Sequence, residues 1–246
     1  MSPVAVHTVF ELLAYTVGFR LFLYEKRRLA LPALAGPDRG VWIGVAAIAG
    51  AAIGSKLGFW IEDPAAAFGE FPDWRHLLQG KTIVGALLGG LVAVEATKRV
   101  VGIRERSGDA FVLPLAVGMA IGRLGCFFAG LGDHTYGNAT SLPWGVDFGD
   151  GIARHPTQLY EALFVLAIGT WLRTNERRFP QAGDRFRWYM VAYLAFRFAI
   201  EFIKPLPHAY FSALSGIQLL CIGGLIHYHR TILEPFSGAT RAWERR

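Results

Sequence analysis

The stretch that decides the fold is DAFVLPLAVGMAIGRLGCFFA, residues 109–129. Its 21 residues hold one acidic side chain at the start, Asp109, and one basic side chain, Arg123, among almost continuously apolar ones. A helix that crosses a bilayer needs about 20 predominantly apolar residues. The stretch is therefore predicted to span a membrane, and Arg123 within it is expected to face a partner, water or a polar ligand.

The rest of the chain extends this prediction. Residues of the set AVILMFWYC make up 53% of the 246 residues, mean hydropathy is +0.34, and charged residues are only 18%, whereas a soluble domain has about 25%. Two cysteines cannot build a disulfide scaffold. Together with 109–129, apolar stretches predict an all-α integral membrane protein of about seven transmembrane helices, at roughly 7–24, 40–61, 81–98, 156–173, 187–204 and 211–228.

The basic residues predict the orientation of these spans. Of 25 Lys and Arg, 17 fall in the segments 25–39, 98–108 and 173–187 and in the tail from 229, and four fall in the alternate segments. By the positive-inside rule the N-terminus is then outside and the C-terminus cytoplasmic. The net charge of +6 thus comes from basic residues that are spread over several loops. Because they are not gathered on one surface, nucleic acid is not an expected partner. The first stretch has no basic n-region and contains Glu11 and Arg20, which indicates a retained span rather than a cleaved signal peptide.

The segments predict one polytopic membrane domain over residues 1–246 with a small cap. Residues 130–155 are dense in Gly, Asp and Pro, which favours turns over helix and predicts a periplasmic loop or cap. Glycines spaced four apart predict close packing of helices at Gly50, Gly54 and Gly58, at Gly85 and Gly89, and at Gly118 and Gly122.

Charged residues inside the spans are the first candidates for a site. A charge at mid-membrane costs about 2.5–3.5 kcal/mol on insertion scales, and Arg20 and Lys56 are interpreted as snorkelling or structurally paired. Arg123 and Arg197 offer planar guanidinium groups, which bind a phosphate diester through paired, charge-assisted hydrogen bonds. The alternative is that two Arg–carboxylate pairs hold helices together.

Residues near these arginines complete the first candidate set. Arg197 and Glu201 are four apart on one helix face and could pair, with Lys204 near the outer end of that helix. Gly122 and Gly125 flank Arg123 and would leave room for a bulky ligand.

A second candidate set lies in RHPTQLYE, residues 154–161, at the predicted outer start of the fifth span. Proline at a helix start is harmless because its missing N–H has no partner there anyway. The run gathers many donors and acceptors, which predicts either a ligand-binding entrance or a network that staples the loop. Its candidate residues are Arg154, His155, Gln158, Tyr160 and Glu161.

These motifs together resemble the prolipoprotein diacylglyceryl transferase family. The resemblance lies in GRLGCFFAG (122–130), PWG (143–145), RHPTQLYE (154–161) and RFAIEFIK (197–204), with Tyr15 and Gly18 in the first span and Asp109 at the start of the fourth. It implies a multi-pass enzyme of the bacterial inner membrane, which moves diacylglyceryl from phosphatidylglycerol to the lipobox cysteine of a prolipoprotein. It also implies Tyr15 and Asp109 as substrate-binding residues, and no cofactor.

The chain departs from the family pattern at several positions. The motif that begins G-R-x-G normally continues with Asn and later N-G-E, where this chain has Cys126, Ala129 and Leu131. The family also has a His-Gly-Gly element whose histidine is assigned to catalysis, and Val84 stands at that place. Valine cannot take a proton, so His155, His134 or Glu201 would have to serve as base, or the reaction differs, or activity is gone.

The sequence therefore supports two functional hypotheses. In the first, the protein is a transferase in which Arg123 and Arg197 stabilise the departing phosphate, with Glu201 and His155 as further catalytic candidates. Its partners would be phosphatidylglycerol or another anionic phospholipid and the signal peptide of a prolipoprotein. In the second, a divergent homologue binds or transports anionic phospholipid, or uses another acceptor. No metal site is expected, since His227 and His229 are only two residues apart and lack a nearby acid.

Overall fold

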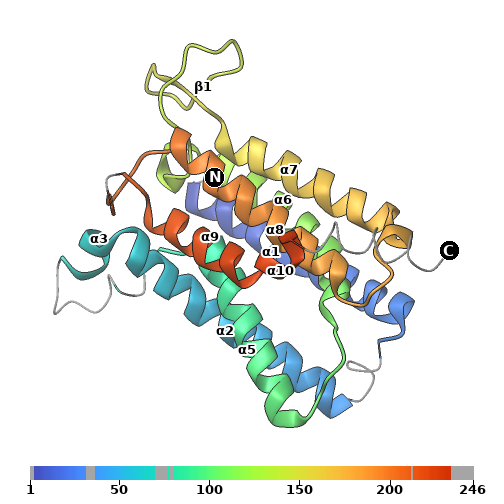
Figure 1. The fold of residues 1–246 in the computed structure, drawn as a ribbon. Helices are drawn as coiled ribbons and strands as arrows, with labels where there is room; N and C mark the ends of the chain where they lie inside the picture. The colour runs from blue at the N-terminus through green and yellow to red at the C-terminus, as the bar shows by residue number, and fades with distance from the viewer. Residues whose placement is uncertain (1–2, 32–36, 70–76, 78–79, 212, 234–246) are drawn as a thin grey trace. The chain divides into compact units, whose positions relative to one another are not determined.

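The computed structural model describes residues 3–31, 37–69, 77, 80–211 and 213–233. The predicted segments 62–81 and 229–246 lie in part outside these residues, at 70–76, 78–79 and 234–246. The described chain is helical except for one small hairpin (Figure 1). Its elements are α1 (Pro3–Leu29), α2 (Pro37–Glu62), α3 (Pro64–Phe68), α5 (Ile83–Val101), η2 (Gly108–Phe111), α6 (Val112–Ala129), η3 (Gly130–Asp133), β1 (Val146–Asp147), β2 (Ala153–Arg154), α7 (Thr157–Thr174), η4 (Glu176–Arg178), α8 (Asp184–Ile200), η5 (Glu201–Ile203), α9 (Gly216–His227) and α10 (His229–Leu233).

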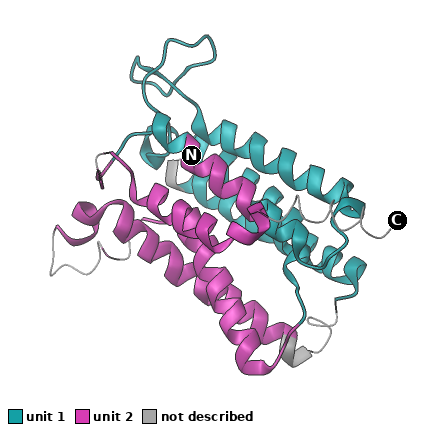
Figure 2. Ribbon diagram, in the orientation of Figure 1, with its two compact units in different colours: residues 1–35, 105–189, 200–206 teal, residues 36–104, 190–199, 207–246 magenta. Residues whose placement is uncertain are grey.

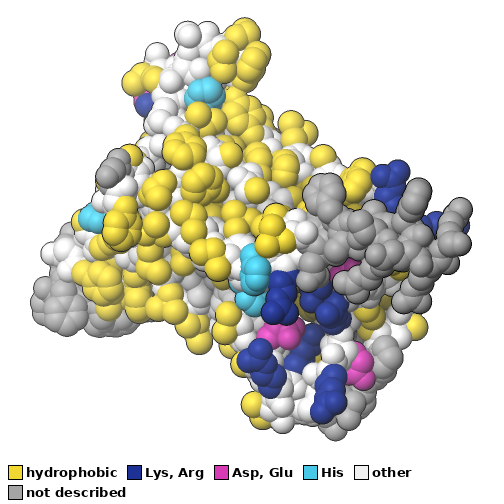
Figure 3. All heavy atoms as spheres, in the orientation of Figure 1, with side chains coloured by type: hydrophobic (Ala, Val, Ile, Leu, Met, Phe, Trp, Pro, Cys, Tyr) yellow, Lys and Arg dark blue, Asp and Glu magenta, His cyan; other side chains and the backbone are white. Residues whose placement is uncertain are grey.

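Each of the seven apolar stretches predicted from the sequence falls on a helix: α1, α2, α5, α6, α7, α8 and α9. Within the described residues, three segments are long and apolar enough to cross a membrane: Ala5–Leu29, Gly40–Glu62 and Gly108–Asp133. Large hydrophobic side chains lie on the outside of these helices, among them Leu12, Phe19 and Ile48, which are 62%, 61% and 75% exposed. Figure 3 shows hydrophobic side chains over much of the visible face. An all-helical fold is thus confirmed, while the number of spans and their orientation stay predictions.

The chain folds as two compact units that are interleaved along the sequence (Figure 2). Unit 1 comprises residues 1–35, 105–189 and 200–206, and unit 2 comprises residues 36–104, 190–199 and 207–246. Helix α8 therefore contributes residues 184–189 and Ile200 to unit 1 and residues 190–199 to unit 2. The single membrane domain expected over residues 1–246 stays a prediction.

Unit 2 is built on a seam of glycines between α2 and α5. A Cβ atom added to Gly54 would lie 2.3 Å from the carbonyl oxygen of Gly85, and one added to Gly89 would lie 2.3 Å from that of Gly50. The two backbones approach too closely for any side chain, as the four-residue glycine spacing predicts. A Cβ at Gly58 would likewise meet Thr82 Oγ1, at the start of α5.

Unit 1 is built around α6, which packs against α1 and α7. Gly118 faces α1, where an added Cβ would lie 3.4 Å from the Ala14 carbonyl oxygen. The same test at Gly122 finds no atom within 4 Å, so the expected packing pair of Gly118 and Gly122 is wrong at its second member. Gly125 takes that place instead, since its added Cβ would lie 2.5 Å from Phe10 Cβ. The α1-facing glycines on α6 are seven residues apart, which is two helical turns.

Residues 130–155 contain η3 and a two-stranded hairpin joined by turns and loops, and the periplasmic cap expected there stays a prediction. After η3, the chain forms an antiparallel hairpin that pairs Val146 with Arg154 and Asp147 with Ala153. The Asp147 carboxylate accepts hydrogen bonds from three successive backbone N–H groups, those of Gly149, Asp150 and Gly151, at 2.8–3.1 Å. These bonds fix the turn, and the positive φ angles of +108° at Gly149 and +79° at Gly151 explain why glycine stands there.

Candidate active site

Arg123 and Glu161 form a buried ion pair that joins α6 to α7. Arg123 Nη2 lies 3.0 Å from Glu161 Oε1 and 2.9 Å from Oε2, and the residues are 7% and 2% exposed. The sequence predicted an Arg–carboxylate pair as one alternative for Arg123, and the structure identifies Glu161 as the partner. Removing one member of a buried pair typically costs about 3–5 kcal/mol, because the other charge is left uncompensated. Each side chain therefore holds the other in place.

Gln158 lies one helical turn before Glu161 and faces the same way. The residue is 1% exposed, and among the described residues neither its Nε2 nor its Oε1 has a hydrogen-bond partner. A buried polar group without a partner costs about 1–3 kcal/mol. An amide left in this state next to an arginine–glutamate pair is what a site for a polar ligand would contain.

The two glycines that flank Arg123 have different roles. A Cβ added to Gly122 would meet no atom of the described residues within 4 Å, and the room for a ligand expected there stays a prediction. Gly125 packs against Phe10, so the expectation that it too leaves room for a ligand is not met.

His155 and Tyr160 lie together where the cap meets α7. His155 Nδ1 is 3.4 Å from Tyr160 Oη, which accepts a 2.8 Å hydrogen bond from Trp144 Nε1. The backbone of His155 is bonded on both sides of the loop: its carbonyl accepts from the Gly137 N–H, and its N–H donates to the Asn138 carbonyl. The cap thus fixes the backbone of His155, and its imidazole lies beside Tyr160 of α7.

Arg154 forms contacts within residues 130–155. A network of this kind was the second interpretation of residues 154–161. The Arg154 guanidinium lies 2.7 Å from both carboxylate oxygens of Asp150 and 5.0 Å from the ring centre of Tyr136. The hydrogen bonds from Arg154 lower the pKa of Asp150 below its usual value. The predicted substrate contact of Arg154 stays a prediction.

The segment after α8 is tied to the cap through its backbone. Arg197 is 6% exposed in α8, and Glu201 is 7% exposed in η5, since the α-helix ends at Ile200. The carbonyl oxygens of Ile203 and Lys204 accept hydrogen bonds from Asn138, at 2.8 and 3.3 Å. Arg197 belongs to unit 2 and Arg123 to unit 1, and their joint action on a phosphate stays a prediction.

Asp109 and Tyr15 have hydrogen-bond partners other than the Arg123–Glu161 pair. Asp109 accepts hydrogen bonds from the backbone N–H groups of Gly183 and Phe186, at 2.9 and 3.1 Å, and so caps the start of α8. It precedes Arg123 by 14 residues of mostly helical chain, or about 21 Å. Tyr15 is 66% exposed and donates to Glu11 on its own helix. The resemblance implied that both bind substrate, and the structure gives Asp109 a structural role.

Ion pairs connect the segments at the end of unit 1 that holds Asp109. Glu25, which is 1% exposed, lies 2.7 Å from Arg28 and 2.9 Å from Arg173. Glu176 lies 3.0 Å from Arg28 and 3.1 Å from Arg185. Burial acts to raise the pKa of Glu176, but the hydrogen bond from Arg28 and the neighbouring arginine charges outweigh it and leave that pKa below its usual value.

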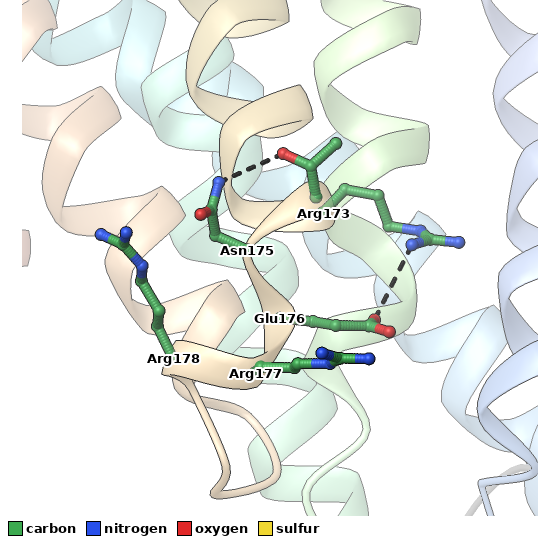
Figure 4. A pocket seen from close by; sticks show the side chains of 6 residues that line it. Arg173, Asn175, Glu176, Arg177 and Arg178 are labelled. Carbon is green, nitrogen blue, oxygen red and sulfur yellow. Dashed lines mark hydrogen bonds and ion pairs between the residues drawn. The ribbon is translucent and has the colours of Figure 1, made fainter.

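A pocket of about 550 Å³ opens beside these ion pairs. It is lined by residues 173–178, and Figure 4 shows Glu176 beside Arg173 and Arg177, with Arg178 pointing to the other side of the chain. The pocket is shallow and basic, as expected of a predicted cytoplasmic loop, and it is remote in sequence from the residues around Arg123.

Val84 occupies the first turn of α5 and is 1% exposed. The position that resembles the family's histidine is thus filled by a packed apolar side chain in unit 2. Sequence reasoning named Glu161 as a candidate but missed that it is the partner of Arg123, because the two residues are 38 apart and lie on different helices.

Fold and site together define an all-helical protein with membrane-length helices and a buried arginine–glutamate pair below a small loop cap. The family model described as prolipoprotein diacylglyceryl transferase matches residues 2–231. The chain belongs to this family.

Individual relatives agree with this assignment. A protein of Teredinibacter turnerae named phosphatidylglycerol–prolipoprotein diacylglyceryl transferase is 31% identical over 198 residues, which cover 73% of this chain and 67% of the relative. Proteins of the same name from Solidesulfovibrio magneticus and Methylococcus capsulatus are 36% and 33% identical, over 64% and 70% of this chain and 61% and 69% of their own lengths. The chain thus matches about two thirds of the length of these relatives.

Proposed function

We propose that this protein transfers the diacylglyceryl group of phosphatidylglycerol to the cysteine thiol of a prolipoprotein, the activity in the names of its relatives. It would act as a multi-pass enzyme of a bacterial inner membrane, with its N-terminus and the cap outside and its C-terminus in the cytoplasm. The observation that carries the proposal is the buried group of Arg123, Glu161 and Gln158 on facing sides of α6 and α7.

The buried group suits the anion that the reaction handles. Glu161 holds Nη2 of the Arg123 guanidinium, whose flat array of N–H donors matches the oxygens of a phosphate diester. The amide of Gln158 adds a donor that has no hydrogen-bond partner in the part of the chain that the structure describes. The open space beside Gly122 gives the headgroup a place next to Arg123.

In the proposed reaction the cysteine thiolate attacks the glyceryl carbon that carries the phosphate. A C–S bond forms, the C–O bond to phosphate breaks, and the electron pair of that bond leaves with glycerol phosphate. Arg123, joined by Arg197 in the proposal, stabilises the charge that develops on the departing phosphate. The thiol proton goes to a base, because the thiolate is the reactive form.

His155 is the proposed base, and Glu201 is the second candidate. The imidazole of His155 lies where the cap meets α7, 3.4 Å from Tyr160 Oη, and imidazole is the side chain that most often transfers protons in enzymes. Glu201 is buried at the end of α8, where a carboxylate could serve the same purpose.

The test uses the purified full-length protein in detergent with labelled phosphatidylglycerol and a lipobox peptide. Labelled peptide and released glycerol phosphate in equal amounts are expected, and Glu161→Gln and Gln158→Leu should each lower the rate. A matched control is Gln218→Leu, since Gln218 is equally buried but its amide is used to cap α9 and to bond Phe198.

The second hypothesis, lipid binding without transfer, predicts a different pattern. Val84 in place of the family's histidine is the observation that favours it. In that case the protein retains labelled phosphatidylglycerol in an Arg123-dependent manner, but neither glycerol phosphate nor labelled peptide appears.

A further inference from the structure

Three side chains that bind transition metals converge near the outer end of α6. His7 of α1, Cys126 of α6 and Asp133 of η3 each offer one ligand atom, and these atoms all lie within 4.8 Å of one another. His7 Nδ1 and Asp133 Oδ1 are 3.0 Å apart. All three residues belong to unit 1, and the proposed transfer reaction uses none of them.

The close approach of α1 to α6 creates this cluster. Gly125 lets the backbone of α1 pack directly on α6, with Phe10 against the glycine and the His7 carbonyl oxygen 3.7 Å from the place of an added Cβ. Cys126 is the next residue along α6 and is 8% exposed. The turn of η3 then returns Asp133 to the same place, one helical turn beyond the end of α6.

A further residue orients the carboxylate. Thr135 Oγ1 donates a 2.5 Å hydrogen bond to Asp133 Oδ2, which leaves Oδ1 directed at His7. Outer-shell bonds of this kind are a regular feature of metal sites, where they fix the orientation of a ligand. The side chain of His7 is 31% exposed, so an ion can reach the cluster from its side.

The chemistry of the three donors selects the ion. A thiolate, a carboxylate and a neutral imidazole together compensate the charge of a divalent cation, and the positive charge of nearby Arg123 is already compensated by Glu161. Zinc binds these donors at about 2.0–2.3 Å in tetrahedral geometry, which places ligand atoms roughly 3.3–3.8 Å apart. Small side-chain rotations bring the observed spacing into this range.

We propose that His7, Cys126 and Asp133 form a binding site for a divalent transition metal ion, zinc above all, with water as the fourth ligand. Cysteine selects against magnesium and calcium, which prefer oxygen donors. The site would clamp α1, α6 and the start of the cap together next to Arg123.

The test is titration of the chelator-treated, full-length protein with cobalt(II), which replaces zinc and reports its ligands by absorption. We expect one cobalt ion to bind per chain and to give a near-ultraviolet band from thiolate-to-cobalt charge transfer. Zinc binds more tightly, so adding zinc should displace the cobalt and remove the band. Cys126→Ser should abolish the charge-transfer band. Thr135→Val should weaken binding by about tenfold or more without removing the band.

The matched control is Cys221→Ser, since Cys221 is a buried cysteine of α9 outside the cluster. It should leave the cobalt spectrum unchanged. Should Cys126→Ser fail to fold, His7→Gln at a partly exposed position tests the same site and should lower cobalt affinity. Cobalt binding without a charge-transfer band, or a band that persists in Cys126→Ser or disappears in Cys221→Ser, would overturn the proposal.

Discussion

At the scale of single residues, the shape of the Arg123 charge matters as much as its sign. One nitrogen of the guanidinium contacts both oxygens of Glu161, and a phosphate bound beside it would meet a planar array of donors. Lysine offers a point charge instead. Arg123→Lys and Arg197→Lys are each expected to lower the rate of transfer by about 100-fold, the range seen when one preorganised donor is removed from a developing anion.

The measurement is turnover of labelled phosphatidylglycerol by variants that insert and unfold like the wild type. The Arg154–Asp150 pair supplies the comparison, because Arg154→Lys removes a forked contact to a carboxylate within residues 130–155. Near-normal turnover in either the Arg123 or the Arg197 variant would mean that forked phosphate recognition is not its role.

The residue at position 84 offers a second test at this scale. Val84 is buried in the first turn of α5, so Val84→His needs the space that Ala86→Gly would provide. If the site still resembles the family's, the double variant gains an imidazole suited to accept a proton, and transfer to a lipobox thiol should rise above that of the wild type. The assay is initial rate with phosphatidylglycerol at saturating peptide.

The competing result is equally specific. If His155 or Glu201 already acts as base, His155→Ala or Glu201→Gln abolishes transfer, and the Val84→His, Ala86→Gly variant shows no gain. Inactivity of both the wild type and the double variant would reject transfer to this acceptor and favour lipid binding alone.

At the scale of elements, the pairing of α2 with α5 depends on the absence of side chains. A Cβ at Gly85 would lie 2.2 Å from the Gly54 carbonyl oxygen, so Gly85→Ala must push the two helices apart. Overpacking of this kind typically costs about 1–3 kcal/mol. We expect a lower melting temperature for Gly85→Ala in detergent, measured by thermal unfolding followed by circular dichroism.

Gly44 of α2 is the control for this prediction, because a Cβ added there meets no atom within 4 Å. Gly44→Ala should leave the melting temperature unchanged or raise it slightly, since alanine favours helix over glycine. Equal melting temperatures for Gly85→Ala and the wild type would show that the glycine seam is not needed for the stability of the pair.

The helices could be predicted from the sequence because apolar runs of the right length leave few alternatives. The partners of single residues on them could not be predicted, since a run of apolar residues does not say which face meets which neighbour. Gly122 and Gly125 are equally small and both flank Arg123, yet one borders open space and the other packs against Phe10. Asp109 resembled a binding residue and is the cap of α8, a bond across 74 residues.

At the scale of the whole molecule, the distribution of basic residues makes a prediction about orientation. With 17 of 25 Lys and Arg in one set of segments and four in the alternate set, residues after His229 should be cytoplasmic and residues 130–155 periplasmic. Reporter fusions that are active only on one side of the membrane measure this directly. A phosphatase fused within the cap should be active and one fused after Leu233 inactive, and the reverse pattern would reject the seven-span arrangement.

The ion pairs on the predicted cytoplasmic side show why this scale is hard to predict residue by residue. Arg28, Arg173 and Arg185 were counted as loop charges, yet each is bound to a carboxylate of unit 1. The proposed metal site could not be predicted from the sequence either. His7 and Cys126 are far apart in the sequence and become neighbours only through the packing of α1 on α6.

The interleaving of the two units has a consequence for the order in which the protein is made. Helices α2 and α5 are separated by about twenty residues, so their hairpin can close soon after synthesis. Helix α1 is made first, but its partner α6 leaves the ribosome only after the whole of the α2–α5 pair. Because unit 1 also includes residues 200–206, we expect it to be completed only after most of the chain has been synthesised.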